Sequence, residues 1–431
     1  MENKVKKMYT DYTYPPYSEY MDKHAPVPHQ YSTGLFPEQI NHYIYKGKKK
    51  NFINYSILVV GVGLGSDIIN MGYLLRKYKN KRMVGIDLSS TSLDVCKKRL
   101  QKYNLENDIE LIEMSLLDLD PQIHGKFDCI ICCGVLHHLE NPQKGLNSLK
   151  NVLKDDGFMY IMVYGKYGRT GVYHMQDLMK KINYNENSDD FPNKIKNFKA
   201  VYKELPKNNW FKKGEHLISD HKCGDEGIVD LILHHQDRSY DIKELYEWIN
   251  NSNLNIIDFI VDSKYKLNYE IKGIEYPKNI IDKYSINEIF FSDIIKYNFY
   301  VSKNKNTTAS IYDLDNIMIL VFIQKEDLNT ILEYYKSHKT NSIYIKYDMK
   351  YTINDIDRWR EGSCIEFDVI MNDIIYTILN NIDNKITTRK IFDIVREKLN
   401  IETNNDELLK IFLPVYEKFQ LYDLILLKSS L

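Results

Sequence analysis

The chain of 431 residues is long enough for two or three domains that each bury a core of their own. Its 58 Lys and Arg residues nearly balance 59 Asp and Glu, and the formal net charge of −1 excludes a strong overall attraction to nucleic acid or to an anionic membrane. The apolar runs are too short to span a bilayer, and the polar start Met1–Lys7 is not that of a secretory signal. We therefore expect a cytoplasmic protein that contacts no membrane.

Residues 1–50 form a tyrosine- and proline-rich N-terminal arm, in which the prolines exclude one long helix. The tyrosines and prolines concerned are Tyr9, Tyr12, Tyr14, Pro15, Pro16, Tyr17, Tyr20, Pro26, Pro28, Tyr31 and Pro37. Such an arm either closes over a bound ligand and presents aromatic rings to it, or packs across the neighbouring domain as a strap. The sequence leaves both roles open.

A β-branched strand, Ile57–Val60, runs directly into three alternate glycines, Gly61, Gly63 and Gly65, and then into a predicted helix. Glycine lets the backbone turn sharply and lets a ligand approach it closely. The helix turns its free N–H groups towards the same turn. In a doubly wound sheet this turn is a nucleotide-binding position. The spacing G-x-G-x-G differs from the dinucleotide pattern G-x-G-x-x-G, whose third glycine would stand at Ser66.

Three further strands continue this pattern. Arg82–Asp87 is predicted as a second strand that ends in a carboxylate, which can accept hydrogen bonds from both hydroxyls of a ribose. A third strand is expected at Ile109–Ile112. The fourth, Phe127–Cys133, runs into the sequence Gly134-Val135-Leu136-His137-His138-Leu139.

This set of motifs resembles class I S-adenosylmethionine-dependent methyltransferases over roughly residues 50–303. The resemblance implies an α/β fold with a doubly wound, seven-stranded Rossmann-like sheet, S-adenosyl-L-methionine as cofactor, and transfer of its methyl group as the reaction. The cofactor-binding residues that it implies are Gly61, Gly63, Gly65, Asp67, Asp87, Leu88, Ser115, Leu116, Gly134 and Val135. Asp87 would hold the ribose hydroxyls. Ser115 and Leu116 would frame the adenine, with Asp118 a second candidate there.

The chain departs from the family pattern at two positions. The family usually has an acidic residue two positions before the first glycine, and here that residue is Val59, so Asp67 becomes the candidate to support the methionine amino group. The adenine position is more often an aspartate, and here it is Ser115. The change at Val59 keeps a second hypothesis open: a catalytically silent, S-adenosylmethionine-binding regulatory or interaction protein.

A fifth strand at Phe158–Tyr164, a sixth at Ile256–Val261 and a final one at Phe299–Val301 complete the predicted sheet. Two insertions, at about residues 165–240 and 264–295, interrupt it. Insertions at the carboxyl edge of such a sheet lie over the active site and carry specificity. We therefore predict that both are substrate lids.

The candidate catalytic residues are Arg169, Tyr173 and His174 of the first insertion, together with His137 from the fourth-strand motif. An arginine can clamp a carboxylate, and a histidine can accept a proton at neutral pH. Methyl transfer to an alcohol or an ammonium group needs such a base, and His137, His138 and His174 are all candidates. For each residue the alternative is a structural role in ordering its loop.

The run from Asp230 to Tyr240 closes the first insertion and, with the segment Tyr164–Gln176, resembles a pair of motifs in a large set of uncharacterised bacterial methyltransferases. Asp237 and Arg238 either act in the site or pair with each other or with backbone and fix the lid. No helical i, i+4 pair or distant partner accompanies these histidines, so we predict no metal site.

Residues 309–431 follow a polar linker and are predicted to form a smaller C-terminal α+β domain that resembles a winged helix. The predicted elements are strands at Ile317–Ile323 and Leu421–Leu427 and helices at Asp373–Ile382, Thr388–Leu399 and Asp406–Phe419. This part carries 15 Lys and Arg against 20 Asp and Glu, a poor balance for binding phosphates. We therefore expect a homodimer contact or a protein partner there. The layout is loosely similar to that of bacterial protein-lysine methyltransferases, in architecture only.

These observations predict an arm at 1–50, a methyltransferase domain at 51–303 and an accessory domain at 309–431. The expected reaction is transfer of a methyl group to a nitrogen or oxygen of a protein or small-molecule acceptor. A nucleic-acid methyltransferase is disfavoured by the charge balance. It is also disfavoured because the chain reads Gly134–His137 where such enzymes carry an N/D-P-P-Y/F motif.

Overall fold

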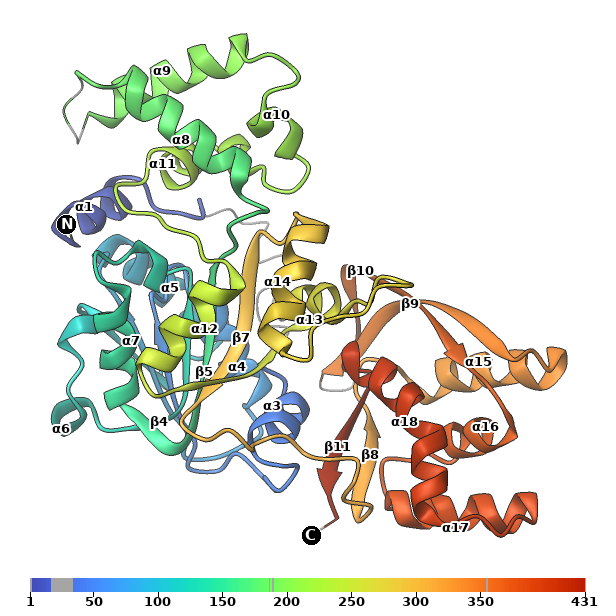
Figure 1. Ribbon diagram of the computed structural model, residues 1–431. Helices are drawn as coiled ribbons and strands as arrows, with labels where there is room; N and C mark the ends of the chain where they lie inside the picture. Colours follow the sequence, from blue (N-terminus) through green and yellow to red (C-terminus); the bar gives the residue numbers. More distant parts are fainter. Residues whose placement is uncertain (1, 17–33, 186, 188–189, 354–355, 431) are drawn as a thin grey trace. The chain divides into compact units, whose positions relative to one another are not determined.

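The computed structural model describes residues 2–16, 34–185, 187, 190–353 and 356–430, and the chain forms two compact units (Figure 1). The first comprises Met1–Tyr31 and Phe52–Lys305, and the second Ser32–Asn51 and Asn306–Leu431. The N-terminal arm that we expected over residues 1–50 is thus divided between the units. Our expectations for Tyr17, Tyr20, Pro26, Pro28 and Tyr31 concern residues outside the described part of the chain.

The first unit is built on the predicted seven-stranded sheet, in the order β3-β2-β1-β4-β5-β7-β6. Neighbouring strands are parallel except at β7, which runs antiparallel to β5 and to β6. The strands are β1 (Ser56–Val60), β2 (Arg82–Asp87), β3 (Ile109–Glu113), β4 (Phe127–Cys133), β5 (Leu153–Tyr164), β6 (Asn255–Phe259) and β7 (Lys296–Ser302). Every residue of β1 is buried, which explains its unbroken apolar sequence. The fold class is confirmed.

Helices connect the parallel strands, so the carboxyl ends of β1 to β5 meet at one edge of the sheet. These helices are α4 (Ser66–Leu74), α5 (Ser90–Lys102), α6 (Pro121–His124), α7 (Pro142–Asn151) and α12 (Ile242–Asn251), with short turns η2 (Leu116–Asp118) and η3 (Leu136–His138). Side chains cap several of them: Ser89 accepts an N–H at the start of α5, and Asn141 does so at α7. The loops at that edge are held by these fixed helix starts.

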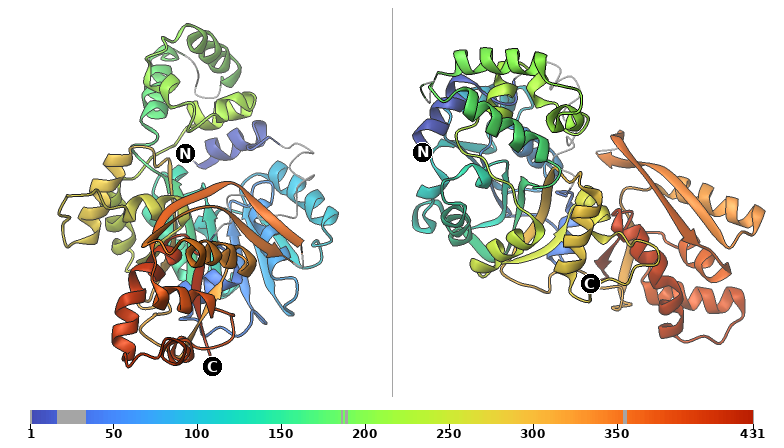
Figure 2. Two further views of the ribbon diagram at one scale, coloured as in Figure 1. Left: turned by 90° about the vertical axis from the view of Figure 1, so that its right-hand side faces the viewer. Right: turned by 45° about the horizontal axis from the view of Figure 1, so that its top comes forward.

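The first insertion folds into a lid of helices α8 (Thr170–Ile182), α9 (Phe191–Glu204), α10 (Trp210–Gly214) and α11 (Asp225–Ile232), joined by the turn η4 (Asp220–Lys222). The lid has an apolar core of its own, and Met8 of helix α1 (Glu2–Asp11) belongs to that core. Figures 1 and 2 show α1 between the lid helices and α5. The second insertion forms α13 (Val261–Asn268) and α14 (Ile280–Phe291), and Tyr284 of α14 joins the core of the sheet.

In the second unit, β8 (Asn316–Leu320) pairs with β11 (Ile425–Ser429), and three helices follow the predicted bounds closely. They are α16 (Asp373–Asn380), α17 (Thr388–Leu399) and α18 (Asn405–Leu421). The sequence analysis did not find α15 (Lys325–His338) or the hairpin of β9 (Ser342–Ile353) and β10 (Ile356–Ile370). The terminal strand begins at Ile425 rather than at Leu421, because α18 continues to Leu421.

Helix α3 (Pro37–Ile44) belongs to the second unit because its polar side chains bind there. Gln39 and Tyr43 both donate hydrogen bonds to the carboxylate of Asp423, which is 1% exposed. A buried carboxylate is stable only when its oxygens are hydrogen-bonded. These bonds hold the segment before the sheet domain in the C-terminal unit.

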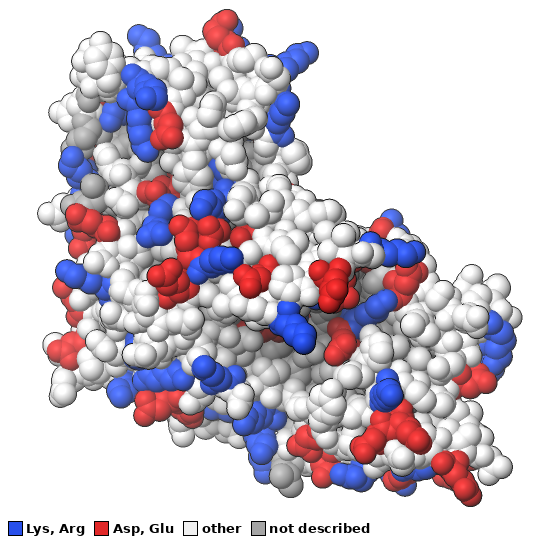
Figure 3. Space-filling view, viewed as in Figure 1, with Lys and Arg blue, Asp and Glu red and all other residues white. Residues whose placement is uncertain are grey.

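The visible surface carries both kinds of charge (Figure 3). On the face seen in Figure 3, Lys and Arg alternate with Asp and Glu, and neither sign gathers into one extended patch. Of the helices described here, none combines the length and the apolar composition that crossing a membrane requires.

Candidate functional site

The three glycines after β1 all adopt positive φ, but they face different surroundings. A Cβ on Gly61 would lie 2.2 Å from Cγ2 of Val135, and one on Gly65 would lie 2.5 Å from Sγ of Cys96. At Gly63, with φ +50°, the nearest atom to such a Cβ is a backbone oxygen 4.0 Å away. Gly61 and Gly65 therefore allow the loop to pack against the protein, whereas Gly63 faces open space that a ligand can fill.

Asp87 ends β2 beside this loop, and its carboxylate is held by backbone groups. Oδ2 accepts the N–H of Gly63 at 2.8 Å, and Oδ1 accepts the N–H of Ser89 at 2.9 Å. Burial raises the pKa of this carboxyl, while these backbone hydrogen bonds oppose the rise. The structure thus brings together Asp87 and Gly63, two of the cofactor-binding residues that the resemblance implies.

The position at which the family usually carries an acidic residue is buried in the sheet. Val59 is 2% exposed and lies in β1, between Gly85 and Ile131 of the adjacent strands. Asp67 stands in the first turn of α4 and hydrogen-bonds the thiol of Cys133 at the end of β4; burial, and then this acid, raise the pKa of that thiol. The acid thus lies between the glycine loop and β4, where the sequence analysis needed one.

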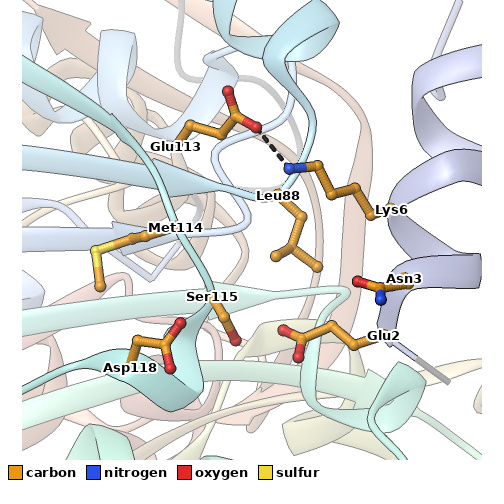
Figure 4. Close-up of a pocket in the computed structure, with 8 residues that line it drawn as sticks. All are labelled: Glu2, Asn3, Lys6, Leu88, Glu113, Met114, Ser115 and Asp118. Atoms are coloured by element: carbon orange, nitrogen blue, oxygen red, sulfur yellow. Dashed lines mark hydrogen bonds and ion pairs between the residues drawn. The ribbon is translucent and has the colours of Figure 1, made fainter.

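A pocket lies at the carboxyl ends of β2 and β3, next to Asp87 (Figure 4). Its lining residues are Glu2, Asn3, Lys6, Leu88, Glu113, Met114, Ser115 and Asp118. Ser115 and Asp118 are two of the residues expected around the adenine, and Leu88 is one of the expected cofactor-binding residues. Ser115 uses its hydroxyl to accept the N–H of Leu117, and Leu116 points into the core of the sheet instead of the pocket.

Helix α1 forms the outer wall of this pocket. Lys6 reaches across it to Glu113, with 2.6 Å between Nζ and Oε1. Asn3 and Glu2 lie on the same side in Figure 4. Helix α1 thus lies over the pocket and is packed in place, and the role of the arm in closing over a bound ligand stays a prediction.

At the end of β4, Gly134 adopts φ +74° and the chain enters η3. His137 is fully buried, and neither of its ring nitrogens has a hydrogen-bond partner among the described residues. Its ring lies 3.9 Å from that of Tyr164. Burial holds the pKa of His137 well below its usual range, so the ring is neutral.

His138 and His234 stack on each other with ring centroids 3.9 Å apart. The backbone of Gln236 hydrogen-bonds Nδ1 of each ring and so determines the tautomer of each neutral ring. The carbonyl of Gln236 can only accept, so the Nδ1 of His138, 2.8 Å away, carries a proton. The N–H of Gln236 donates to Nδ1 of His234 at 3.0 Å, so a neutral His234 carries its proton on Nε2. The Nε2 of His138 is therefore left as a proton acceptor.

Arg169 follows β5 and is 4% exposed. Its guanidinium carbon lies 3.5 Å from the ring centre of Tyr164, and Nη2 lies 3.8 Å from the carboxylate of Asp237. Nε and Nη2 of Arg169 lack hydrogen-bond partners within the described ranges. The carboxylate of Asp237 also accepts from Gln176 at 2.9 Å and from Tyr173 at 3.4 Å.

Two residues singled out in the sequence lie elsewhere. His174 is on the exposed side of α8, 5.4 Å from the ring of Trp210, and the structure does not bring it to this cluster. Arg238 is exposed and lies over the ring of Tyr240 rather than pairing with Asp237. Tyr173 and Arg169 do meet His137 around Tyr164, as three of the four candidate catalytic residues.

Two groups of possible metal ligands occur among the residues that the structure describes, each with its ligand atoms within 4.8 Å of one another. They are His137, His138 and Asp237, and His138, Asp230 and His234. In the second group Nδ1 of His234 already accepts an N–H, which leaves its proton on Nε2 and no lone pair for a metal there. In the first, Asp237 faces the cation of Arg169. The expectation of no metal site stays a prediction.

Comparison with known proteins places these features in a family. Residues 58–159 match the methyltransferase domain family. PKMT2 from Rickettsia typhi has the same fold, with a TM-score of 0.57 at 18% identity over 97% of this chain and 77% of that chain. Its complex with AdoHcy gives 0.56 at 16% identity over 92% and 76%. Residues 58–159 thus match a methyltransferase domain, and the chain has the fold of PKMT2.

Curated relatives of this methyltransferase domain are mostly partial matches. An uncharacterised protein of a Synechococcus strain is 31% identical over 206 residues, 47% of this chain and 48% of the relative. The ubiquinone biosynthesis O-methyltransferase of Dechloromonas aromatica is 29% identical over 103 residues, 24% of this chain and 42% of the relative. The chain thus spans about half the length of the curated relatives it matches.

The sequence did not predict that Tyr9 and Asp230 are hydrogen-bonded beside His234. The hydroxyl of Tyr9, on α1, donates to Oδ1 of Asp230 at 2.8 Å and lies 3.3 Å from Nε2 of His234. The signal was present in the spacing of Val5, Met8, Tyr9 and Tyr12, which is typical of one face of a helix.

Proposed function

We propose that the chain is an active S-adenosylmethionine-dependent methyltransferase that methylates a nitrogen or oxygen of its acceptor. One observation carries the cofactor part of the proposal: Gly63 faces open space while its N–H binds Asp87. A ribose above Gly63 would meet the free lone pairs of Asp87, since each carboxylate oxygen has two. The adenine would then fill the pocket beside Leu88 and Ser115.

The methionine end of the cofactor would extend along Gly61 and Gly134 towards Asp67. Both glycines adopt positive φ, which glycine allows without strain. Asp67 supplies a carboxylate for the amino group in place of the family's usual acid. PKMT2, with the same fold, has been seen with AdoHcy, which supports this family of ligands.

The acceptor site would be the cluster around Tyr164 at the ends of β4 and β5. Methyl transfer forms a bond from the acceptor to the methyl carbon and breaks its bond to the cofactor sulfur, which becomes a neutral thioether. The acceptor's proton would pass to Nε2 of His138, the ring nitrogen left unprotonated by the bond to Gln236. The carboxylate of Asp230 lies within 4.8 Å of a ring nitrogen of His138.

The charges of the cluster favour an amine as the acceptor. Asp230 and Asp237 bring two acids against the single cation of Arg169. Lone pairs on His137 and His138 add unfilled hydrogen-bond acceptors, which suit a group rich in N–H donors. By their names the relatives include both N- and O-methyltransferases, so a hydroxyl acceptor is the alternative.

The test uses the full chain, S-adenosylmethionine and a cell extract as the source of acceptors. Calorimetry should show binding, and a methyl label should pass from the cofactor into extract components. A His138→Gln variant should bind the cofactor as the parent does and transfer no label. Binding with no transfer by the parent chain would favour the catalytically silent regulator instead.

A further inference from the structure

We propose that Tyr9, on the N-terminal helix α1, is a positioning residue of the acceptor site that acts through His234 on the ring of His138. This inference rests on the proposed function, because it assigns the base of that reaction a supporting group. Tyr9 is far from the sheet in sequence and carries no motif. The argument depends on where α1 is held and on the direction of three hydrogen bonds.

Helix α1 is held in place by several contacts. Lys6 pairs with Glu113 at the pocket beside β3, and Met8 packs in the apolar core of the lid. The hydroxyl of Ser89, at the start of α5, donates to the carbonyl of Tyr9 at 3.4 Å. These contacts leave the side chain of Tyr9 pointing at α11 and the loop after it, where Asp230 and His234 lie.

Each hydrogen bond around Tyr9 has a defined donor and a defined acceptor. The N–H of Gln236 donates to Nδ1 of His234, so Nε2 of that ring is the donor towards the oxygen of Tyr9. The Tyr9 hydroxyl in turn donates to Oδ1 of Asp230. Each group uses its donor once, so the ring of His234 is held in one tautomer and one orientation.

The orientation of His234 then fixes His138. The two rings lie 3.9 Å apart with an angle of 23° between their planes, so a rotation of one would collide with the other. Gln236 provides the second constraint, since its carbonyl holds Nδ1 of His138. Nε2 of His138 is thereby aimed in a fixed direction, which is what a general base needs before substrate arrives.

The same helix lines the proposed adenine pocket through Asn3 and Lys6. One rigid element therefore contacts both the cofactor pocket and the network behind the base. A chain in which α1 is displaced would lose Tyr9 from the acceptor site and open the pocket at once. This explains why an N-terminal segment without a family motif is packed so closely against the domain.

The matched variants are Tyr9→Phe and Tyr12→Phe. Tyr9 lies in the last turn of α1 and Tyr12 directly after the helix, but the hydroxyl of Tyr12 makes no hydrogen bond to the residues described in the structure, and its ring rests 5.4 Å from that of Phe191. Calorimetry with S-adenosylmethionine monitors folding and the cofactor pocket for each. We expect affinities within about twofold of the parent chain for both, because neither hydroxyl lines that pocket.

The decisive readout is nitrogen NMR of full chains carrying histidine labelled at the ring nitrogens. In the parent, His234 should show a protonated Nε2 and an accepting Nδ1, and His138 the reverse. Tyr9→Phe should shift the Nε2 signal of His234 and lower methyl transfer about tenfold or more, whereas Tyr12→Phe should change neither. A parent His234 protonated on Nδ1 would overturn the proposal by itself. So would a Tyr9→Phe chain with parental ring signals and parental transfer.

Failure of the proposed function would look different. If the parent chain binds no S-adenosylmethionine or transfers no label, while the ring signals respond to Tyr9→Phe as described, the positioning network exists and the reaction assigned to it is wrong. If the parent transfers label and the ring signals ignore Tyr9, the reaction stands and the positioning role fails.

Discussion

The carboxylate of Asp87 accepts the backbone N–H of Gly63 at 2.8 Å, so the acid that ends β2 and the turn that follows β1 form one unit. The consequence is that the two groups expected to bind opposite sides of a ribose are positioned before any ligand arrives. Pre-organisation of this kind lowers the ordering cost of binding. Removing either group should therefore affect affinity more than it affects folding.

The glycine loop offers a contrast between two similar substitutions. Gly61→Ala would put a Cβ 2.2 Å from Val135, and we expect it to destabilise the domain by about 1–3 kcal/mol. Gly63→Ala meets no atom closer than 4.0 Å, so its cost to folding should be only the strain of φ +50°, about 1–2 kcal/mol. Its methyl group points into the space assigned to the cofactor, so calorimetry should show at least a tenfold loss of S-adenosylmethionine affinity. Equal affinity in Gly63→Ala and the parent would contradict the assigned cofactor path.

Substitutions of His138 and of His174 should have different effects on methyl transfer, because the two rings lie in different places. His138→Gln should lower methyl transfer by about a hundredfold or more, the usual effect of losing a general base, without changing cofactor binding. His174→Gln is the control, because that ring lies on the exposed side of α8. Label transfer at saturating cofactor measures both. A large loss in His174→Gln together with an active His138→Gln would show that the base had been assigned to the wrong helix.

Arg169 and Asp237 should depend on each other for stability. Both side chains are almost fully buried, 5% and 2% exposed, and removing one charge leaves the other without its partner. We expect Arg169→Gln or Asp237→Asn alone to destabilise the domain by about 3 kcal/mol, and the double variant to be less destabilised than the sum. Denaturant unfolding of all four chains completes the cycle. Strictly additive losses would mean that the two charges do not interact.

Glu288 should make stability depend on pH. Burial raises the pKa of this carboxyl to about 7, and it accepts hydrogen bonds from Tyr297 and from the N–H of Ile242. Because the folded pKa lies above the unfolded value, its contribution is complete below about pH 4.5 and is lost as pH rises through 7. Glu288→Gln should therefore gain stability over the parent between pH 5 and pH 8, by about 2 kcal/mol. Unfolding midpoints of both chains at the two pH values test this. A constant difference would show that Glu288 ionises normally.

The sheet was predictable because its strands are apolar runs that end in loops with unusual chemistry. Burial on both faces dictates the sequence of β1 and β4, and glycines at positive φ mark the turn. The cofactor residues follow from the order of the same motifs along the chain, and they stay predictions. Leu116 is an exception: the resemblance implies that it lies beside the adenine, whereas its side chain packs in the core.

The acceptor site could be predicted only in part, because it is made by contacts between distant segments. Tyr9, His138 and His234 come from the arm, the sheet and the lid, and no local pattern shows that they meet. His174 has the residue type of a base, but its place on α8 turns it to solvent. In the second unit, α3 joins the C-terminal strands through a buried acid, Asp423, that local sequence cannot reveal.

The most direct test of the central claim is calorimetry of S-adenosylmethionine with the parent chain and with Asp87→Asn. We predict one binding site in the parent and a loss of affinity of about ten- to a hundredfold in the variant. The reason is that Asp87→Asn replaces a charged carboxylate, which accepts hydrogen bonds from the ribose, with a neutral amide. Gly63→Ala should show the same loss, since it blocks the other side of the sugar. No binding to a folded parent chain, or equal binding by Asp87→Asn, would contradict the claim.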